Sequence, residues 1–372
     1  MPPPLSLFTW GSNQYAQLGH GTPRAGVAAV LEPRAVPELA AEDGYALEDV
    51  FCGAAVTGVK TSDGQVLTVG ETEGEEDELG NGLFQPLETG ESSVKQVAFG
   101  AQHRILLSAS GQVFTWGLGH HGRLGNGSWD DSYVPHKVLG PLRRLIVEAV
   151  AAGSGHSVAM ADGDVYTWGS GHCGQLGHHN LCDQVLPKRV EAFDDSRVVT
   201  QVACGADFTA CLTADGRVYT FGFGAGGQLG HGNERDQWQP RVVVELEGKH
   251  VVRIACGYYH MLALTDAGDV YAWGSGTSGK LGLGDCRTSR VPELVKDLHG
   301  KAVVDVACGW NHCACITAAG QVFTWGYGRF GRLGHGDEGS HARPRPVAGD
   351  LGGHRAVKLA CGAAHTAVLC TF

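Results

Sequence analysis

The sequence predicts an all-β protein, a seven-bladed β-propeller in which each blade is a sheet of four antiparallel strands. Three observations predict this fold: a segment like VFTWG, a segment like ACG and a Leu-Gly pair each recur seven times in the 372 residues. Glycine is abundant, with 57 residues, and runs that would form helices are lacking between the markers. The glycines of the VFTWG-like marker are Gly11, Gly70, Gly117, Gly169, Gly222, Gly274 and Gly326.

One repeat, residues 303–354, accounts for the four strands. VVDVAC (303–308) and HCACIT (312–317) are apolar and rich in strand-forming residues, and QVFTW (321–325) follows after a tight turn. A glycine-rich loop then leads to ARPRPV (342–347), whose prolines favour an outer edge strand. Four such strands without an intervening helix are typical of a propeller blade.

The two ends of the chain predict how the ring closes. The last repeat stops at HTAVLCTF (365–372), just after its second strand, and the third strand that it lacks is present as LSLFTWG (5–11). We therefore expect the N-terminal strand to complete the C-terminal blade without a covalent link, which hides the edges of both repeats. The whole chain, residues 1–372, is then expected to be a single propeller domain.

Composition excludes several function classes. The net charge is −11, from 28 basic and 39 acidic residues, so nucleic-acid binding is not expected. No apolar run reaches the length of a membrane span, and MPPPLSLFTWG does not resemble a secretory signal. We expect a cytoplasmic or nuclear protein that is not secreted. The twelve cysteines include no C-x-x-C pair, so the sequence predicts buried free thiols and no metal site.

The motif G-x-G-x-x-G, which can mark a dinucleotide-binding loop, occurs five times, for example as GSGHCG (169–174) and GYGRFG (326–331). A nucleotide site needs one such loop before a helix, whereas these copies precede loops and edge strands. They are interpreted as blade corners, and no cofactor is expected. Tyr327, Arg329 and Phe330 are specific to the last copy and are expected to decorate the surface.

Histidine recurs three residues after the glycine of the ACG-like marker. The five copies lie in different blades, so we expect each to hydrogen-bond the turn of its own blade rather than to bind metal. Val56 and Phe208 hold the same position in two other blades, which means that an ionisable side chain is not essential there. The histidines are His103, His156, His260, His312 and His365.

The two residues between the marker glycine and the histidine position, here called the face pair, vary from blade to blade. Most face pairs consist of small residues, but two adjacent blades contribute Tyr258-Tyr259 and Trp310-Asn311, and the preceding blade contributes Asp207. Exposed aromatic residues among small ones are typical of a protein-binding hot spot. The alternative is that these side chains are partly buried in the central channel.

The second repeat departs from the pattern with the acidic segment ETEGEEDELGNG (71–82). Such a run is interpreted as a solvated surface loop, with the docking of a basic partner segment as the sharper alternative. A calcium site is not predicted because the spacing differs from that of an EF-hand. The acidic side chains in question are Glu73, Glu75, Glu76, Asp77 and Glu78.

The motifs ACG-x-x-H, DG-x-V-Y-T-W-G and G-x-L-G-H-G resemble the repeat of the regulator of chromosome condensation (RCC1) family over essentially the whole chain. The resemblance implies seven blades and, as one activity, guanine-nucleotide exchange on a Ran-like small GTPase. That activity is associated with an Asp and a His in the face loops. Asp207 matches, but Asn311 stands where the His is expected. The blades from 100 to 362 are too uniform to contain a wedge insertion, and a basic chromatin-binding tail is not expected.

Light sensing, which a plant member of the family performs, requires tryptophans in neighbouring face pairs, where this chain has Ala206, Tyr258 and Trp310. The sequence therefore predicts a monomeric, non-enzymatic regulatory propeller that binds a protein partner through its face loops. The alternative is a guanine-nucleotide exchange factor for a Ran-like small GTPase.

Overall fold

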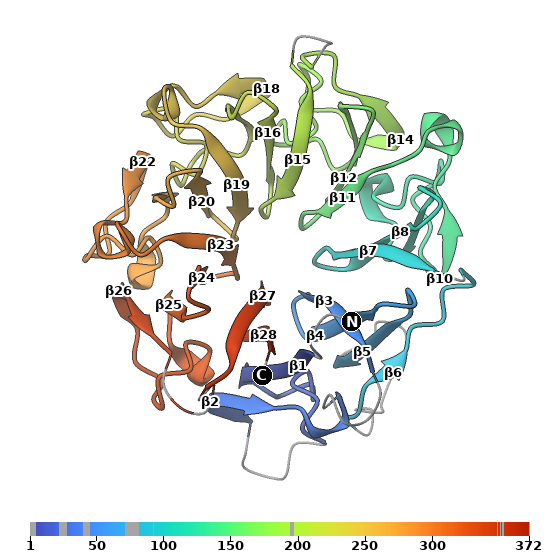
Figure 1. Cartoon of the computed structure of the whole chain (residues 1–372). Helices are drawn as coiled ribbons and strands as arrows, with labels where there is room; N and C mark the ends of the chain where they lie inside the picture. Colours follow the sequence, from blue (N-terminus) through green and yellow to red (C-terminus); the bar gives the residue numbers. More distant parts are fainter. Residues whose placement is uncertain are drawn as a thin grey trace.

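Seven four-stranded antiparallel sheets surround a common axis in the computed structural model (Figure 1). The structure describes residues 5–21, 28–39, 45–70, 82–91, 93–193, 197–347, 349, 351 and 353–371. The predicted fold class is confirmed. The acidic side chains from Glu73 to Glu78 lie outside the described residues.

The blade predicted in detail from residues 303–354 forms as expected. Its strands are β23 (Val303–Cys308), β24 (His312–Thr317), β25 (Val322–Gly326) and β26 (His341–Pro346), paired in this order. The first strand of each blade is nearest the axis and the fourth lies outermost (Figure 1). The prolines lie in the outer strand, where the lack of an N–H group does not cost a hydrogen bond between strands.

The other blades repeat this order with small variations in length. Their strands are β3 (Leu47–Cys52), β4 (Val56–Thr61), β5 (Val66–Gly70), β6 (Gln85–Pro86), β7 (Val94–Phe99), β8 (His103–Ser108), β9 (Val113–Gly117), β10 (Ser132–Lys137), β11 (Ala149–Ala152), β12 (His156–Ala161), β13 (Asp164–Gly169), β14 (Gln184–Arg189), β15 (Val199–Cys204), β16 (Phe208–Thr213), β17 (Val218–Gly222), β18 (Gln237–Val242), β19 (Val251–Cys256), β20 (His260–Thr265), β21 (Val270–Gly274) and β22 (Ser289–Leu294).

Helical structure among the described residues is limited to short 3₁₀ turns in the connections. They are η1 (Pro37–Leu39), η3 (His120–Gly122), η4 (Gly140–Arg144), η5 (Val244–Leu246), η6 (Thr277–Gly279), η7 (Lys296–Leu298) and η8 (Arg329–Gly331). None of the helices in the described ranges is long and apolar enough to cross a bilayer.

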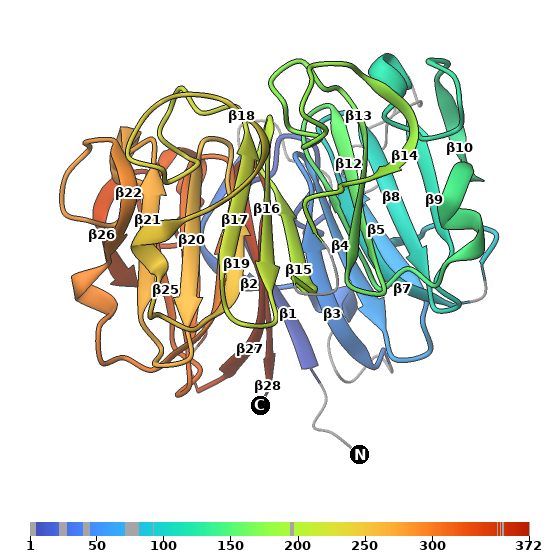
Figure 2. The same cartoon turned by 90° about the horizontal axis from the view of Figure 1, so that it is seen from above.

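The two chain ends meet in one sheet, as the sequence predicts. Strand β1 (Leu5–Ser12) pairs with β28 (His365–Thr371) in a continuous register from Leu5↔Thr371 to Gly11↔His365. The complete sheet has the order β2-β1-β28-β27, with β2 at Ala29–Ala35 and β27 at Arg355–Cys361. Figure 2 shows the ends of β1 and β28 on the same side of the ring. Backbone hydrogen bonds thus close the propeller.

Tryptophans of the third strands join neighbouring blades. Trp10, Trp168, Trp273 and Trp325 are fully buried. Each indole Nε1–H donates to a backbone carbonyl of the preceding blade, for example from Trp273 to Gln228 at 2.9 Å and from Trp325 to Lys280 at 3.1 Å. The same contact crosses the closure, from Trp10 to Arg332 at 3.0 Å. Burial of a large ring together with a satisfied N–H makes each interface specific.

The glycine-rich loops serve this packing. Gly282 of a Leu-Gly pair has φ +73°, and a Cβ there would lie 2.8 Å from Nε1 of Trp325 in the next blade. A side chain at this position would therefore be strained and would push the two blades apart. The repeated G-x-G-x-x-G motifs begin at the end of a third strand and form the blade corners.

Candidate functional site

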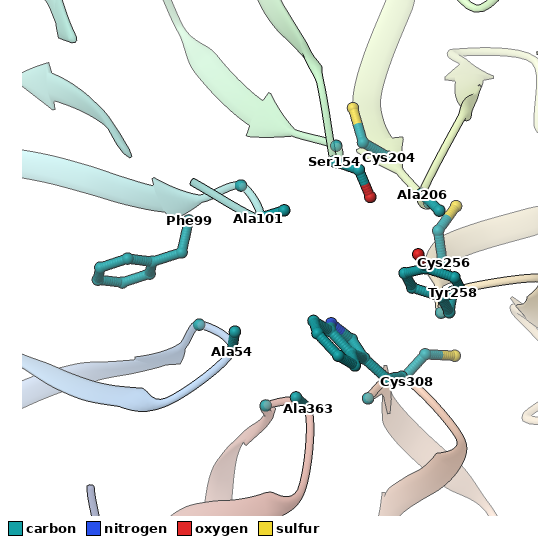
Figure 3. Close-up of a pocket in the computed structure, with 18 of the residues that line it drawn as sticks. Ala54, Phe99, Ala101, Ser154, Cys204, Ala206, Cys256, Tyr258, Cys308 and Ala363 are labelled. Carbon is teal, nitrogen blue, oxygen red and sulfur yellow. The ribbon is translucent and has the colours of Figure 1, made fainter. Parts of the chain in front are cut away.

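The face pairs surround one mouth of the central channel. A cavity of about 160 Å³ on the axis is lined by the ends of the first strands and by the first residue of every face pair. Figure 3 shows the aromatic side chains of Tyr258 and Phe99 on the wall of this cavity, together with the small residues Ala54, Ala101, Ser154, Ala206 and Ala363, and Trp310 also lines it. The end of the ring that carries the face pairs is called the loop face below.

Backbone hydrogen bonds hold this rim in place. The N–H of Ser154 donates to the carbonyl of Ala206 at 2.8 Å, that of Ala206 to Tyr258 at 3.2 Å, and that of Tyr258 to Trp310 at 3.4 Å. Each bond joins two adjacent blades. The face pairs are thus fixed to one another as well as to their own sheets.

A second set of bonds ties each face pair to its own blade. The carbonyl groups of Asp207, Tyr259 and Asn311 accept hydrogen bonds of 2.8–2.9 Å from the residue that follows the third-strand glycine. These donors are Phe223, Ser275 and Tyr327. The loop backbone is therefore held on both sides, which limits the conformational entropy that a bound partner would remove.

The aromatic side chains of three blades form a continuous row on the loop face. The ring centroids of Phe223 and Tyr259 are 5.7 Å apart, those of Tyr259 and Tyr258 are 4.6 Å apart, and those of Tyr258 and Trp310 are 5.4 Å apart. These spacings are typical of favourable edge-to-face and tilted contacts. The structure brings together the predicted aromatic residues and adds Phe223, which the sequence analysis did not identify.

The face pairs were interpreted either as an exposed hot spot or as side chains partly buried in the central channel. Their exposed fractions show that both interpretations apply in part. The side chain of Trp310 is 43% exposed, whereas Trp273 and Trp325 of the repeat are fully buried. Tyr258, Tyr259, Asn311 and Asp207 are half-buried. The row therefore lines the channel mouth on one side and offers apolar surface to solvent on the other.

Asp207 lies beside this aromatic row. Burial raises the pKa of its carboxyl group, and within the described residues no hydrogen bond or ion pair reaches the carboxylate. Burial also raises the pKa of the Tyr259 hydroxyl, with smaller contributions from Tyr258 and from the charge of Asp207. The carboxylate and the phenol are thus close enough to interact electrostatically.

A lysine that the sequence analysis missed supports the other end of the site. Nζ of Lys280 donates a hydrogen bond to Oδ1 of Asn311 at 2.9 Å, and burial lowers the pKa of this amine. Lys280 precedes a Leu-Gly pair, where other blades have Gln175, Gln228 or Arg332. A cation at a position where other blades have glutamine was the signal available in the sequence.

The residues specific to GYGRFG gather around Arg332. Its guanidinium lies 5.0 Å from the ring centroid of Tyr327 and 5.9 Å from that of Phe330, and Arg329 lies 4.7 Å from the ring of Phe330. Arg332 also donates to the carbonyl of Ala363 at 2.8 Å. These side chains form a second cluster on the loop face, next to the row of aromatic residues through Asn311 and Tyr327.

The predicted hydrogen-bond partner of the recurring histidines was wrong. Each was expected to bond its own turn, but Nε2 of His156 lies 3.0 Å from Oγ1 of Thr209 in the next blade, and Nε2 of His312 lies 3.0 Å from Oγ1 of Thr366. The threonine hydroxyl donates its own proton to a carbonyl, as Thr209 does to Gln175 at 2.8 Å. The histidine is therefore the donor and carries its proton on Nε2.

Each imidazole bonds the next blade instead of its own turn because of its direction. The imidazole lies over the marker glycine and reaches the neighbouring sheet. A Cβ at Gly153 would contact the imidazole of His156 and also the Gly205 carbonyl at 2.8 Å. Where the histidine is replaced by Phe208, the corresponding residue of the next blade is Met261, and both belong to one buried apolar cluster. The residue at this position thus matches its neighbour across the interface.

Comparison with known proteins places the chain in a family. The model of the RCC1-like domain matches residues 6–368. The chain is 38% identical over 373 residues to the E3 ubiquitin-protein ligase HERC2 of Homo sapiens, covering 97% of this chain but only 8% of the length of HERC2. It is 34% identical over 351 residues to the ultraviolet-B receptor UVR8 of Arabidopsis thaliana, covering 92% of this chain and 77% of that protein.

Among solved structures, Prp20p of Saccharomyces cerevisiae superimposes with a TM-score of 0.88, at 21% identity, over 100% of this chain and 92% of that one. This likeness shows the fold. The repeat pattern, the closed ring of seven blades and the matched family model agree, and the chain belongs to the RCC1-like domain family.

Proposed function

We propose that this propeller binds a protein partner through the interaction patch formed by Asp207, Tyr258, Tyr259, Trp310 and Asn311, and that it acts as a non-enzymatic regulatory scaffold. The observation that carries the proposal is the row of aromatic side chains that spans adjacent blades and ends in a Trp310 that is 43% exposed. The tryptophans of the third strands are buried between blades, whereas Trp310 lies in a face pair and contacts Tyr258, so packing between blades does not account for it.

The patch has the properties of a pre-organised binding surface. Its backbone is hydrogen-bonded between blades and within each blade, and its rings already contact one another. Binding would therefore order few side chains, and aromatic anchors of this kind supply most of the affinity in many interfaces. The half-buried Asp207 gives one end of the patch a carboxylate, and the buried Lys280 holds the side chain of Asn311 at the other end.

The relatives are consistent with such a role. Prp20p has described binding properties to Gsp1p and histones, so a propeller of this fold carries protein-binding surfaces. HERC2 contains a region similar to this chain within a much longer ubiquitin ligase. We infer for this chain a protein partner, without the catalytic activity of the longer relative.

The test is affinity purification of a partner with wild-type protein and with the double variant Tyr259→Ala/Trp310→Ala. Trp238→Ala is the matched control, because Trp238 is 48% exposed but lies on the outer strand β18. We expect the double variant to lose the captured partner and to bind the purified partner at least 30-fold more weakly, since a hot-spot residue contributes about 2 kcal/mol or more.

The melting temperature of the double variant is expected to equal that of the wild type. Equal capture by all three proteins would contradict the proposal. A large loss of stability in the double variant would show instead that the two side chains serve the core.

Guanine-nucleotide exchange on a Ran-like GTPase is the second candidate, favoured by one observation. Asp207 is a half-buried carboxylate without an ion-pair partner in the described part of the chain, next to the aromatic row. The test is the release of a fluorescent guanine nucleotide from a purified Ran-type GTPase. Acceleration that Asp207→Ala abolishes would establish exchange and would refute the purely non-enzymatic proposal.

A further inference from the structure

Two histidines and an aspartate from neighbouring blades meet on the surface, and none of them belongs to the interaction patch. His121 lies in the turn η3, His172 follows the third strand β13 of the next blade, and Asp183 immediately precedes the outer strand β14 of that blade. One ligand atom from each of the three side chains lies within 4.8 Å of the other two. The turn η3 packs against β13 and β14, which brings the three residues together.

The distances from the two imidazoles to the carboxylate lie on either side of the spacing expected for two ligands of one metal ion. Nδ1 of His121 lies 2.8 Å from Oδ2 of Asp183, and Nε2 of His172 lies 3.6 Å from Oδ1 of the same carboxylate. Two ligands bound at about 2.05 Å to one tetrahedral zinc ion lie about 3.4 Å apart. The two imidazole rings are 5.0 Å apart and nearly perpendicular, so they do not stack on each other.

Asp183 has one oxygen with a structural role and a second one available for a ligand. Its Oδ1 accepts the N–H of Gly171 at 2.8 Å, and Asp131 and Asp236 bond Gly119 and Gly224 in the same way in other blades. The hydrogen bond that Oδ1 accepts is therefore a feature of the repeat, whereas the contact between Oδ2 and His121 is specific to this pair of blades. The bond to Gly171 fixes the orientation of the carboxylate, as outer-shell hydrogen bonds do in metal sites.

The two histidines are not required by the repeat. The position of His121 is held by Ser278 in another blade, with nearly the same backbone conformation (φ +63° and +61°). The position of His172 is held by Ala225 in the following blade. The imidazoles are half-exposed at His121 and exposed at His172, so solvent ions reach them.

We propose that His121, His172 and Asp183 bind a divalent transition-metal ion of the zinc class, with water at the remaining positions. Two imidazoles and one carboxylate are a ligand set that Zn²⁺ accepts, with nitrogen and oxygen ligands at similar distances. On binding, the metal takes the place of the proton on Nδ1 of His121, and the neutral ring carries its proton on Nε2 instead. The ion would join two adjacent blades at the periphery of the ring.

The absence of C-x-x-C pairs led the sequence analysis to predict no metal site. This ligand set has no recognised spacing signature, because its members come from two loops in two blades. Only the packing of η3 over the next blade places them together.

Isothermal titration with Zn²⁺ alone tests the proposal. The background protein carries Cys182→Ser and Cys286→Ser, which removes the exposed thiols that could bind zinc elsewhere. We expect one equivalent of zinc per chain and a rise in melting temperature, because a ligand that binds only the folded state stabilises it.

The variant His121→Ser/His172→Ala uses the residues that other blades have at these positions, so it is expected to fold like the background protein. It should lose the zinc equivalent and the rise in melting temperature. Asp183→Asn keeps an oxygen for the Gly171 N–H and should weaken binding at least tenfold. His299→Ala is the control, because His299 pairs with Asp269 at 2.6 Å in a simple His–Asp pair elsewhere on the surface.

Three results would overturn the proposal: no zinc uptake by the background protein in tenfold molar excess, unchanged uptake by the double variant, or an equal loss in His299→Ala. If the double variant has a lower melting temperature without metal, Asp183→Asn decides the outcome through its zinc affinity.

Discussion

Replacing His156, one of the recurring histidines, by phenylalanine should lower the free energy of unfolding at neutral pH. At mildly acidic pH the variant should be as stable as the wild type or slightly more stable. The imidazole is fully buried, and burial, assisted by the charge of Arg123, lowers its pKa to about 3. Phe208 holds the same position in the next blade, so phenylalanine fits this site in the fold. The variant therefore removes the titratable group at a position whose backbone accepts phenylalanine, and the new ring faces Thr209 where Phe208 faces Met261.

The sign follows from proton linkage. Since the pKa is about 3 in the folded protein and about 6.5 when the chain is unfolded, only the unfolded state gains a proton on His156 as the pH falls below 6.5. The stability that depends on a neutral His156 is present above pH 6.5 and is lost progressively toward pH 3. At pH 5.5 the loss is about 1.4 kcal/mol for this one residue.

At pH 7.5 the variant should be less stable by about 1 kcal/mol, because it lacks the hydrogen bond from Nε2 to Oγ1 of Thr209. The hydroxyl remains satisfied by its own donation to the Gln175 carbonyl at 2.8 Å, so no polar group is left unpaired. At pH 5.5 the linkage of about 1.4 kcal/mol outweighs this cost, and the variant should equal or slightly exceed the wild type.

Urea unfolding followed by tryptophan fluorescence at pH 7.5, 6.5 and 5.5 measures the difference. Thr209→Val is the control, because it removes the hydrogen bond to His156, together with the one from Thr209 to the Gln175 carbonyl, but keeps the histidine. It should therefore keep the acid sensitivity of the wild type. A stability difference between His156→Phe and wild type that does not change with pH would refute the assignment of a neutral, buried imidazole.

Two further predictions concern closure and the patch. Trp10→Ala in the closing strand β1 should destabilise the fold by about 3–5 kcal/mol, because truncation of a fully buried tryptophan leaves a cavity. It should lower the melting temperature far more than Trp238→Ala, which truncates a side chain that is 48% exposed. A small effect would show that the ring does not depend on this interface. Lys280→Gln introduces the residue that another blade has at Gln228. The melting temperature should be unchanged or higher, since burial disfavours the charged amine, whereas partner binding measured by titration should weaken because the contact between Lys280 and Asn311 is lost. Unchanged affinity would exclude Lys280 from the site.

Much of the fold is predictable from local sequence because each blade repeats the same local rules. The strands 303–308 and 312–317 were predicted with the bounds that the structure shows, and the pairing of β1 with β28 followed from a missing strand at one end and an extra strand at the other. The face pairs were also identifiable, since they vary at a position where the surrounding markers do not.

Contacts between blades were less predictable. The repeat spacing indicates that His156 lies near a turn, but it does not indicate that the ring points across the interface to Thr209. The contribution of Phe223 and Lys280 to the patch likewise depends on loops that are distant in sequence. The cluster of His121, His172 and Asp183 is the extreme case, because the glycine motifs that contain the two histidines do not indicate that they meet each other or Asp183.

The sequence by itself determined the number of blades, their strand order and the closure of the ring, because these depend on alternation of apolar residues, turn glycines and repeat length, all of which are local properties. Only the tertiary structure decided which side chains meet on the loop face and at the blade interfaces. Those contacts depend on the direction in which each side chain leaves its loop and on the distance between neighbouring blades, and neither quantity is encoded in spacing along the chain.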